Sequence, residues 1–451
     1  MEKEFKSFKS VAFLIVILSV LCLPIKAEFA QHVASVKNFR ILKYDVNEAF
    51  VGELKHVITI MNPTNSIATG VNLYVPIVRN ETARHYVILC SITPTSGHQL
   101  LSDSSGNIYA CWENLVIMPN QVFTVELVYR VLSFSITYTV NSSLIGSYNK
   151  NSELYLKYTQ PEELIESDNH EIIEEAREIT RGVSDPHAKA RLIYNFVVGY
   201  LQYEMQEKEM GALWALEHRI GDCSEYSYLF VALCRAAGIP ARIQAGFAFH
   251  YAGQSLEEGH MWAEYYLENY GWIPVDATWQ LFDALDGKHF NSIGSTPEII
   301  PYTNYYINGT RVKLMDKQTV QLMALQPNMF GDVSFAQSVV TTIQKVEQLE
   351  TAISLGKLFG ASMIFPAEMR ENEQGLQEVK IFIQNAIDAW ENSAQIANSR
   401  ALVALEKAGN VLNSAWMLIF KTFAIYMGIL IVLLLISLFF VGRSEKVCRK
   451  G

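Results

Sequence analysis

The stretch GDCSEY, residues 221–226, decides how the centre of this 451-residue chain is interpreted. An apolar helix follows it and is expected to end at the AGIP segment, residues 237–240, because glycine and proline stop helices. Cys223 therefore lies in the first turn of a helix. The partial positive charge and free N–H groups there favour a thiolate and could stabilise an oxyanion. Asp222 is better suited to capping this helix than to catalysis.

Two further polar residues follow on strand-like segments. His260 begins the segment HMWAE, and Asp276 lies in GWIPVDATW, residues 271–279. The turn at residues 268–271 predicts that these strands form a hairpin. If Leu267 pairs with Gly271, then His260 and Asp276 are diagonal neighbours on one face, with Cα atoms about 7–8 Å apart. The sequence therefore predicts that the Asp276 carboxylate reaches the His260 imidazole.

These three settings together resemble the transglutaminase-like, papain-related superfamily of cysteine enzymes. A lone cysteine is more often an inert buried residue, but its helix start and its two partners favour a reactive one. The resemblance implies that Cys223 is the nucleophile, His260 the general base and acid, and Asp276 the group that orients His260. Arg242 also matches the family pattern, and we expect it to be structural. Tryptophans could line an acyl cleft or lie in the core, namely Trp214, Trp262, Trp272 and Trp279.

The ends of the chain predict where this chemistry takes place. Residues 1–27 carry lysines and then an apolar run, which is typical of a signal peptide, with an uncleaved anchor as the alternative. Residues 422–442 contain no charge and are followed by a basic tail, residues 443–451. This length predicts one transmembrane helix, and the basic tail favours a cytoplasmic C-terminus. The rest of the chain is then expected outside the membrane, where its net charge of −10 argues against nucleic acid as a partner.

Four of the six cysteines lie in this external part. Cys223 and Cys234 are predicted on one helix, roughly 16 Å apart along its axis. A disulfide requires Cα atoms closer than about 7 Å, which excludes that pair. Cys90 and Cys111 lie in one β-rich region and are the pair that a bridge would join, if one forms. Cys223 then stays free, and Cys234 is expected to be a small buried apolar residue.

Periodicity divides the remainder of the chain into three parts. Residues 28–145 contain β-branched and alternating runs between polar turns, which indicate an antiparallel β-sandwich. Residues 150–330 have helices first and strands later, which predicts an α+β catalytic domain. Residues 331–415 are helical, with one helix before Pro366 and another whose apolar residues recur from Val379 to Leu412. We interpret this last part as a hairpin or stalk, or alternatively as an oligomerisation helix.

The predicted architecture is therefore α+β: a papain-like transglutaminase core between a β-sandwich and a helical stalk with one transmembrane helix. The leading functional hypothesis is cysteine-dependent acyl transfer on a protein or cell-envelope peptide, through a thioester resolved by water or by an amine. No cofactor is expected, because no cysteine and histidine cluster has zinc spacing and no phosphate-binding glycine loop is present. The alternative is a non-enzymatic surface protein that binds a partner through its β-domain and core.

Overall fold

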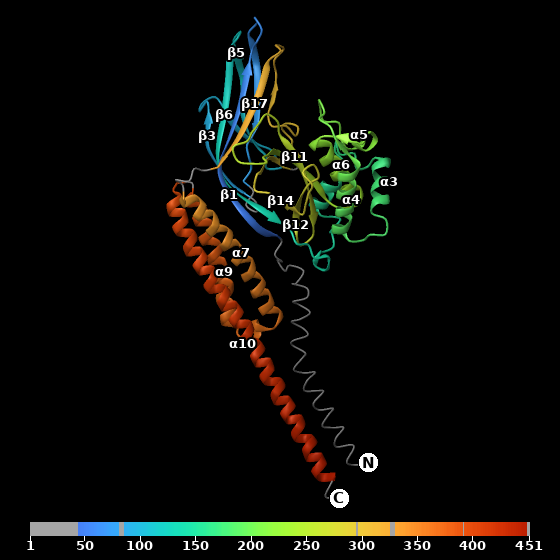
Figure 1. Cartoon of the computed structure of the whole chain (residues 1–451), viewed down its shortest axis with the longest axis vertical. Helices are drawn as coiled ribbons and strands as arrows, with labels where there is room; N and C mark the ends of the chain where they lie inside the picture. Colours follow the sequence, from blue (N-terminus) through green and yellow to red (C-terminus); the bar gives the residue numbers. More distant parts are fainter. Residues whose placement is uncertain (1–43, 81–84, 295, 325–329, 391, 449–451) are drawn as a thin grey trace. The chain divides into compact units, whose positions relative to one another are not determined.

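A computed structural model describes residues 44–80, 85–294, 296–324, 330–390 and 392–448 of the chain (Figure 1). The predicted signal segment, residues 1–27, and the first part of the expected sandwich lie outside the described residues. The described chain divides into two compact units, one ending at Val340 and one beginning at Thr341. The first unit contains the β-sandwich and the α+β core, and the second contains helices.

The sandwich consists of two antiparallel sheets. Its first sheet contains β1 (Asp45–Met61), β3 (His85–Thr93), β6 (Val122–Thr137), β10 (Ser255–Leu256), β14 (Ala284–Leu285) and β17 (Met315–Ala324). Its second sheet contains β2 (Ala68–Pro76), β4 (Gln99–Ser102), β5 (Ile108–Ile117) and β16 (Tyr306–Asn308). Leu54, Ile58 and Ile60 of β1 alternate along the strand and are fully buried, because successive side chains of a strand point to opposite faces. The sequence-based prediction of a sandwich agrees with this arrangement.

The far boundary of the sandwich differs from the expected one. Strands β16 and β17 lie within residues 150–330, the range assigned to the catalytic domain from the sequence. They pair instead with β2 and β1, with Ile58 opposite Gln318 in the second case. The chain therefore leaves the sandwich, forms the α+β core and returns. Linear order cannot reveal such a return, because each strand finds its partner more than 200 residues away.

The α+β core is built on a five-stranded antiparallel sheet with helices packed against it. The sheet follows the order β13 (Leu281–Phe282), β12 (Gly271–Asp276), β11 (His260–Leu267), β9 (Ala241–Ala248) and β15 (His289–Gly294). The helices are α2 (Glu153–Thr159), α3 (His170–Ile179), α4 (Pro186–Tyr200), α5 (Ala212–His218) and α6 (Cys223–Ala236), with a 3-10 turn at Ser142–Leu144. Short strands β7 (Gln202–Tyr203) and β8 (Ile220–Gly221) pair in parallel. Figure 1 shows α3 to α6 gathered beside β11 and β12, on the side away from the sandwich.

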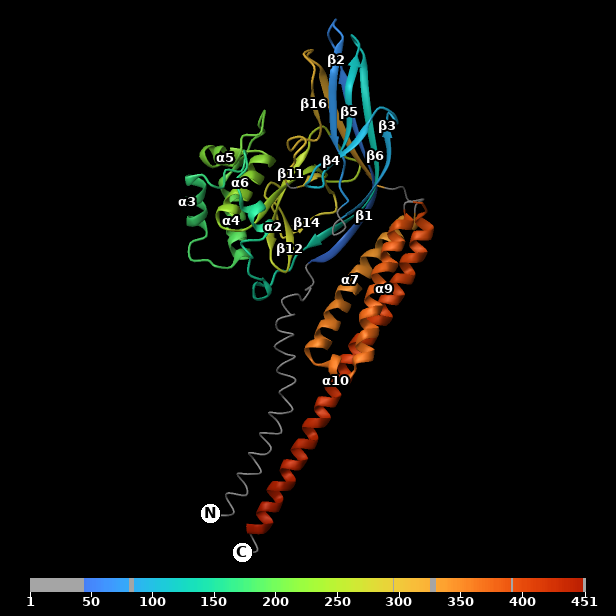
Figure 2. The ribbon, with the colours of Figure 1, turned by 180° about the vertical axis from the view of Figure 1, so that it is seen from behind.

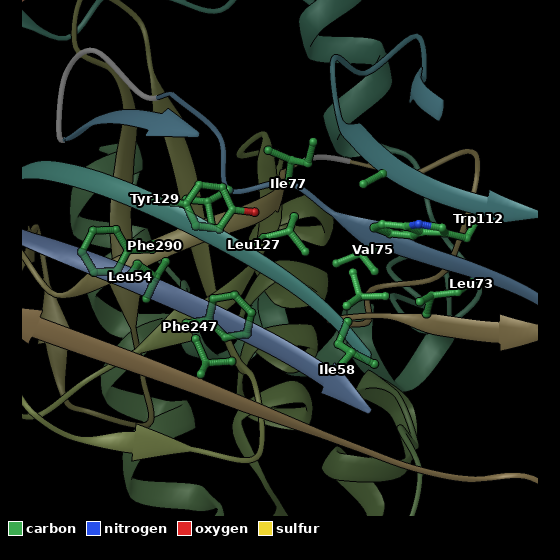
Figure 3. Packing of buried hydrophobic residues seen from close by; sticks show 14 of the residues in the cluster. Leu54, Ile58, Leu73, Val75, Ile77, Trp112, Leu127, Tyr129, Phe247 and Phe290 are labelled. Atoms are coloured by element: carbon green, nitrogen blue, oxygen red, sulfur yellow. The ribbon is translucent and has the colours of Figure 1, made fainter. Parts of the chain in front are cut away.

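The sandwich and the core share buried side chains. Phe247 of β9 and Phe290 of β15 come from the catalytic sheet, yet they are fully buried in one cluster with Leu54 and Tyr129 of the sandwich. Figure 3 shows these rings lying among the aliphatic side chains of β1 and β6. Because burying an aromatic side chain contributes roughly 1.5–3 kcal/mol, the two parts stabilise each other.

The structure shows four free cysteines in its described part, namely Cys90, Cys111, Cys223 and Cys234. Cys90 is exposed on β3 and Cys111 is buried on β5. These strands belong to different sheets of the sandwich, since β3 pairs with β6 whereas β5 pairs with β2 and β4. The suggested Cys90–Cys111 bridge is therefore absent here. The prediction that Cys234 is a buried apolar residue is confirmed.

The second unit is a bundle of helices. It contains α7 (Phe330–Leu358) from Thr341 onward, α8 (Ala361–Ile364), α9 (Pro366–Trp390) and α10 (Ala394–Cys448). Figure 2 shows α7, α9 and α10 running side by side. The sequence predicted one helix through Val379 and Leu412, and this is wrong. The chain turns back after Trp390, where the Ser393 carbonyl accepts the Ala397 N–H.

This turn pairs two halves of the apolar stripe with each other. Small residues of α10, such as Ala401 and Ala408, are fully buried, as are Val379 and Trp390 of α9. The hairpin expected from the sequence lay between the helices on either side of Pro366, so this second turn was not predicted. Assembly of several chains through this unit stays a prediction.

One helix in the described part of the chain is long and apolar enough to cross a membrane. It is the Ala394–Ile436 portion of α10, whose most apolar window has a mean hydropathy of 2.5. This portion of α10 includes the first part of the predicted transmembrane segment, residues 422–442. The last helix of the bundle therefore continues into that segment without a break.

Candidate active site

Cys223 is the first residue of α6, as the sequence predicted. Asp222 caps the helix: its Oδ1 accepts the Ser224 N–H at 2.9 Å, and the Glu225 carboxylate accepts the Asp222 N–H at 3.1 Å. The reciprocal pair satisfies two backbone donors of the first turn. The Ser227 hydroxyl lies 2.7 Å from the Cys223 carbonyl and 3.2 Å from the Met261 carbonyl. The first turn of α6 is thereby tied to β11 beside His260.

The hairpin of β11 and β12 brings His260 and Asp276 together. Leu267 pairs with Gly271 and Ala263 with Val275, which confirms the predicted register. His260 Nε2 lies 2.7 Å from Asp276 Oδ2. Cys223 lies near the same imidazole, since it is among the groups that raise the pKa of His260. With Nε2 on the carboxylate, Nδ1 is the nitrogen left for the thiol.

The Asp276 carboxylate is fully buried and holds several hydrogen bonds. Its Oδ1 accepts the Trp279 N–H at 2.9 Å, and its Oδ2 faces both His260 and His289. Burial by itself would raise its pKa, but the charge and hydrogen bond of His260, with the bond to His289, hold the pKa well below its usual range. Asp276 is therefore a carboxylate at neutral pH.

The Asp276 carboxylate in turn stabilises the protonated form of His260. Burial alone lowers the pKa of His260, yet the Asp276 charge, the Asp276 hydrogen bond and Cys223 outweigh it and raise the pKa to about 9. The imidazole is only 11% exposed, so solvent screens this interaction little. His260 is thus set up to hold a proton beside the sulfur at neutral pH, as a thiolate–imidazolium pair requires.

A pocket of about 420 Å³ opens beside His260. The described residues that line it are Val198, Tyr203, Tyr226, His250, His260, Ala277, Thr278, Trp279 and Gln280. None of these is Asp, Glu, Lys or Arg. His250 and Trp279 stack with ring centroids 4.2 Å apart and form an aromatic wall.

Of the four tryptophans that the sequence could not assign, Trp279 lines this pocket. Trp262 is fully buried behind His260, and Trp272 lies under the Arg242 guanidinium at 4.2 Å. Trp214 stacks on His218 of α5. Arg242 also pairs with Glu264 at 2.6 Å, which matches the structural role expected of it.

Three residues near the site were not predicted from the sequence, because no local pattern marks them. Tyr203 reaches the site because β7 pairs with β8 next to the cysteine turn, and burial first, then Cys223, raise its pKa to about 12. His250 follows β9 and enters the pocket wall. His289 begins β15, and its contact with Asp276 depends on the placement of a distant strand. The polar loop before His260 is the nearest feature that the sequence indicates, and it contains none of these three residues.

His260, Asp276 and His289 lie close enough together to be considered as ligands of a metal ion. Their geometry is that of hydrogen-bonded ion pairs instead. Both imidazoles direct a nitrogen at one Asp276 oxygen, at 2.7 and 3.2 Å, and the second nitrogen of His289 lies 2.9 Å from Asp286. A metal ion would have to replace these bonds, so we assign the residues no ligand role.

Comparisons with known proteins match the part of the chain that contains the candidate site. The Transglutaminase-like superfamily model matches residues 174–277, which include Cys223, His260 and Asp276. A protein-glutamine gamma-glutamyltransferase of Pseudomonas aeruginosa is 30% identical over 118 residues, 24% of this chain and 18% of that protein. An uncharacterized protein of Haemophilus influenzae is 38% identical over 76 residues, 13% of this chain and 21% of that protein. The chain thus spans about a fifth of the length of each relative.

Among solved structures, a proposed cysteine protease from Cytophaga hutchinsonii is similar, with 17% identity and a TM-score of 0.49. The match covers 63% of this chain and 93% of that one. On the strength of the family match and the sequence relatives, residues 174–277 are a domain of the transglutaminase-like superfamily.

Proposed function

We propose that the chain is a membrane-anchored cysteine enzyme that transfers acyl groups from peptide amides, with its catalytic domain outside the cytoplasm. One observation carries the proposal: His260 Nε2 lies 2.7 Å from the buried Asp276 carboxylate, and Cys223, the first residue of α6, is close enough to His260 to raise its pKa. An imidazole held in this way can take a proton from sulfur and return it to a leaving amine.

The first half of the reaction forms a thioester. The Cys223 sulfur attacks the amide carbonyl carbon, and a C–S bond forms as the carbonyl oxygen takes up negative charge. The N–H of Cys223 lies in the first turn of α6, where backbone donors lack intrahelical acceptors, so it is placed to stabilise that oxyanion. The His260 imidazolium then gives its proton to the amine nitrogen, the C–N bond breaks and the amine leaves.

The second half releases the enzyme. Water or a primary amine attacks the thioester carbon, His260 takes the proton of the attacking group, and the C–S bond breaks. Water yields a free acid and makes the reaction a hydrolysis, whereas an amine yields a new amide and makes it a transamidation. Asp276 stabilises the positive charge that His260 carries in both halves.

The pocket supports a neutral acyl donor. Its described lining has no side chain of Asp, Glu, Lys or Arg, and it combines aromatic rings with the polar groups of Thr278 and Gln280. A carboxamide side chain such as glutamine fits these surroundings, because its amide group can form hydrogen bonds with the neutral polar groups of Thr278 and Gln280. The name of the P. aeruginosa relative points to the same donor. The substrate we propose is a glutamine or peptide amide in a protein or cell-envelope peptide.

Mass spectrometry tests the reaction. The full-length protein in detergent is incubated with glutamine-containing peptides, with and without a primary amine. We expect one of three products: a peptide heavier by the amine less the ammonia that leaves, a peptide with the mass gain of deamidation, or the shorter fragments of cleavage. Cys223→Ala should abolish all three. A Cys223→Ala protein that keeps the activity would refute the mechanism.

Thiol labelling in intact cells tests the placement. Cys90 is exposed on the sandwich, and Cys448 lies in the basic tail that we place in the cytoplasm. A membrane-impermeant maleimide should modify Cys90 and leave Cys448 unmodified until the cells are opened. The opposite pattern would reverse the proposed topology.

A further inference from the structure

The second histidine on Asp276 is the strongest feature that the proposed reaction does not use. His289 begins β15, its side chain is fully buried, and its Nε2 lies 3.2 Å from Asp276 Oδ2. Its Nδ1 lies 2.9 Å from Asp286 Oδ1, on a carboxylate that is 31% exposed. Both ring nitrogens thus face carboxylate oxygens.

This arrangement requires a protonated ring. A neutral imidazole has one N–H donor and one nitrogen lone pair, so one nitrogen would point its lone pair at a carboxylate. An imidazolium donates from both nitrogens and satisfies both contacts. Burial lowers the pKa of His289, but the hydrogen bonds to Asp276 and Asp286 outweigh burial and the net pKa lies above its ordinary value.

The surroundings of His289 contain few other charges. The groups that face it are Asp276 at the end of β12, Asp286 in the turn before β15, and His260 on β11, with ring centroids 5.8 Å apart in the last case. Lys288 acts on Asp286, whose pKa is lowered despite burial by its bonds to His289 and Lys288. The Trp262 and Trp279 rings fill the remaining space at 5.2 and 4.7 Å.

We propose, building on the acyl-transfer function above, that His289 is a positioning residue: a buried imidazolium that holds Asp276 through the same carboxylate oxygen as His260. It fixes the carboxylate that orients His260. It also shares the same Asp276 oxygen and places a second positive charge near His260. The shared oxygen and the second positive charge both limit the rise in the pKa of His260. His260 therefore stays acidic enough to protonate the leaving amine.

The size of the effect follows from the ring separation. Two unit charges 5.8 Å apart at the effective dielectric constant of protein interiors change a pKa by about one to two pH units. Removing the His289 charge while keeping a hydrogen-bond donor to Asp276 should therefore move the deprotonation of His260 upward by that amount. His289→Gln makes this change, since the glutamine amide can still donate to Asp276.

The test uses iodoacetate on the full-length protein, because the reaction of this anion with Cys223 depends on the positive imidazolium beside the sulfur. Peptide mass spectrometry reads the alkylation rates of Cys223 and of exposed Cys90 in the same sample across pH. We expect a bell-shaped profile for Cys223, with an alkaline limb that His289→Gln moves upward by about one to two pH units. Cys90 serves as the internal reference and should not change.

Two more variants separate the explanations. His56→Gln replaces an equally buried histidine, whose burial lowers its pKa to about 4 despite its bond to Gln318, and the Cys223 limb should stay in place. Asp286→Asn is the alternative variant if His289→Gln does not fold, because Asp286 is partly exposed and contacts only the second nitrogen of His289. It weakens the protonation of His289 and should move the Cys223 limb upward by a smaller amount. A limb that is unmoved or moves downward in His289→Gln or Asp286→Asn overturns the role of His289. A wild-type Cys223 profile without a bell refutes the thiolate–imidazolium pair and this inference with it.

Discussion

Replacing Asp276 with asparagine isolates the charge that holds the proton on His260. Asparagine has the same shape, so its oxygen can still accept from the Trp279 N–H, which lies 2.9 Å from Asp276 Oδ1. The substitution removes the negative charge 2.7 Å from His260 Nε2. Burial, which lowers the pKa of His260, then acts with little opposition.

The magnitude follows from the His260 pKa. Its rise from 6.5 to about 9 corresponds to roughly 3 kcal/mol of preference for the imidazolium. Because about 1.4 kcal/mol is a factor of ten, the ratio of protonated to neutral His260 at a given pH should fall about 100-fold. The alkaline limb of the pH profile of Cys223 alkylation should move down to pH 6.5 or below.

Alkylation of the full-length protein with iodoacetate measures this change, with Cys90 as the internal reference. Asp283→Asn is the matched control. Asp283 is also a buried carboxylate, but it bonds His187 and Arg191 away from the sulfur. It should lower stability without moving the Cys223 limb. If Asp276→Asn keeps its limb near pH 9, or reacts at neutral pH within about threefold of wild type, the electrostatic reasoning is wrong.

Three further predictions concern the same unit. Gly221→Ala should slow Cys223 alkylation by about tenfold or more and cost about 1–3 kcal/mol of stability. The reason is that an added Cβ would collide with the side chain of the capping residue Glu225. Unchanged alkylation would contradict this. Gly199→Ala should stabilise the unit by about 0.5–1 kcal/mol in chemical unfolding, since no atom lies within 4 Å of the added methyl group in helix α4, and a loss of stability would contradict it. The pKa of His260 is raised, so its stabilisation is complete below pH 6.5 and is lost as pH rises through about 9, whereas the lowered pKa of Asp276 gives stabilisation that is lost as pH falls below 3.8. The unfolding free energy of wild type minus that of Asp276→Asn should therefore be largest between these limits, and a difference independent of pH would refute the linkage.

Local patterns in the sequence were sufficient for the triad. A cap followed by an apolar helix placed Cys223 in a first turn, and a turn between two strands set the register that joins His260 to Asp276. These features depend on residues within one helix or one hairpin, so short-range rules describe them. The sandwich strands before residue 145 were predicted for the same reason, whereas β16 and β17 were not.

The features that the sequence did not reveal depend on distant partners. β15 lies beyond β9 in the sheet, so no local pattern connects His289 to Asp276. The apolar stripe from Val379 to Leu412 has the period of a single helix, and only the packing of α10 against α9 shows that the chain turns between them. Cys90 and Cys111 were named as the pair that a bridge would join if one formed, and both are free, with Cys90 exposed and Cys111 buried. Strand-rich sequence does not say which of two sheets a strand joins.

The sandwich takes part in building the site. The loop that leads into His260 contains β10, which pairs with β17 of the sandwich. The turn that leads into His289 is held at Gly287, whose N–H lies 3.1 Å from the Ser135 hydroxyl of β6 and whose carbonyl accepts from Ser133. Both imidazoles that meet at Asp276 are thus approached by segments fixed to another sheet. Because Phe247 and Phe290 also share the sandwich core, a catalytic domain cut free at residue 150 would lose the supports of the histidines while keeping Cys223 and its helix.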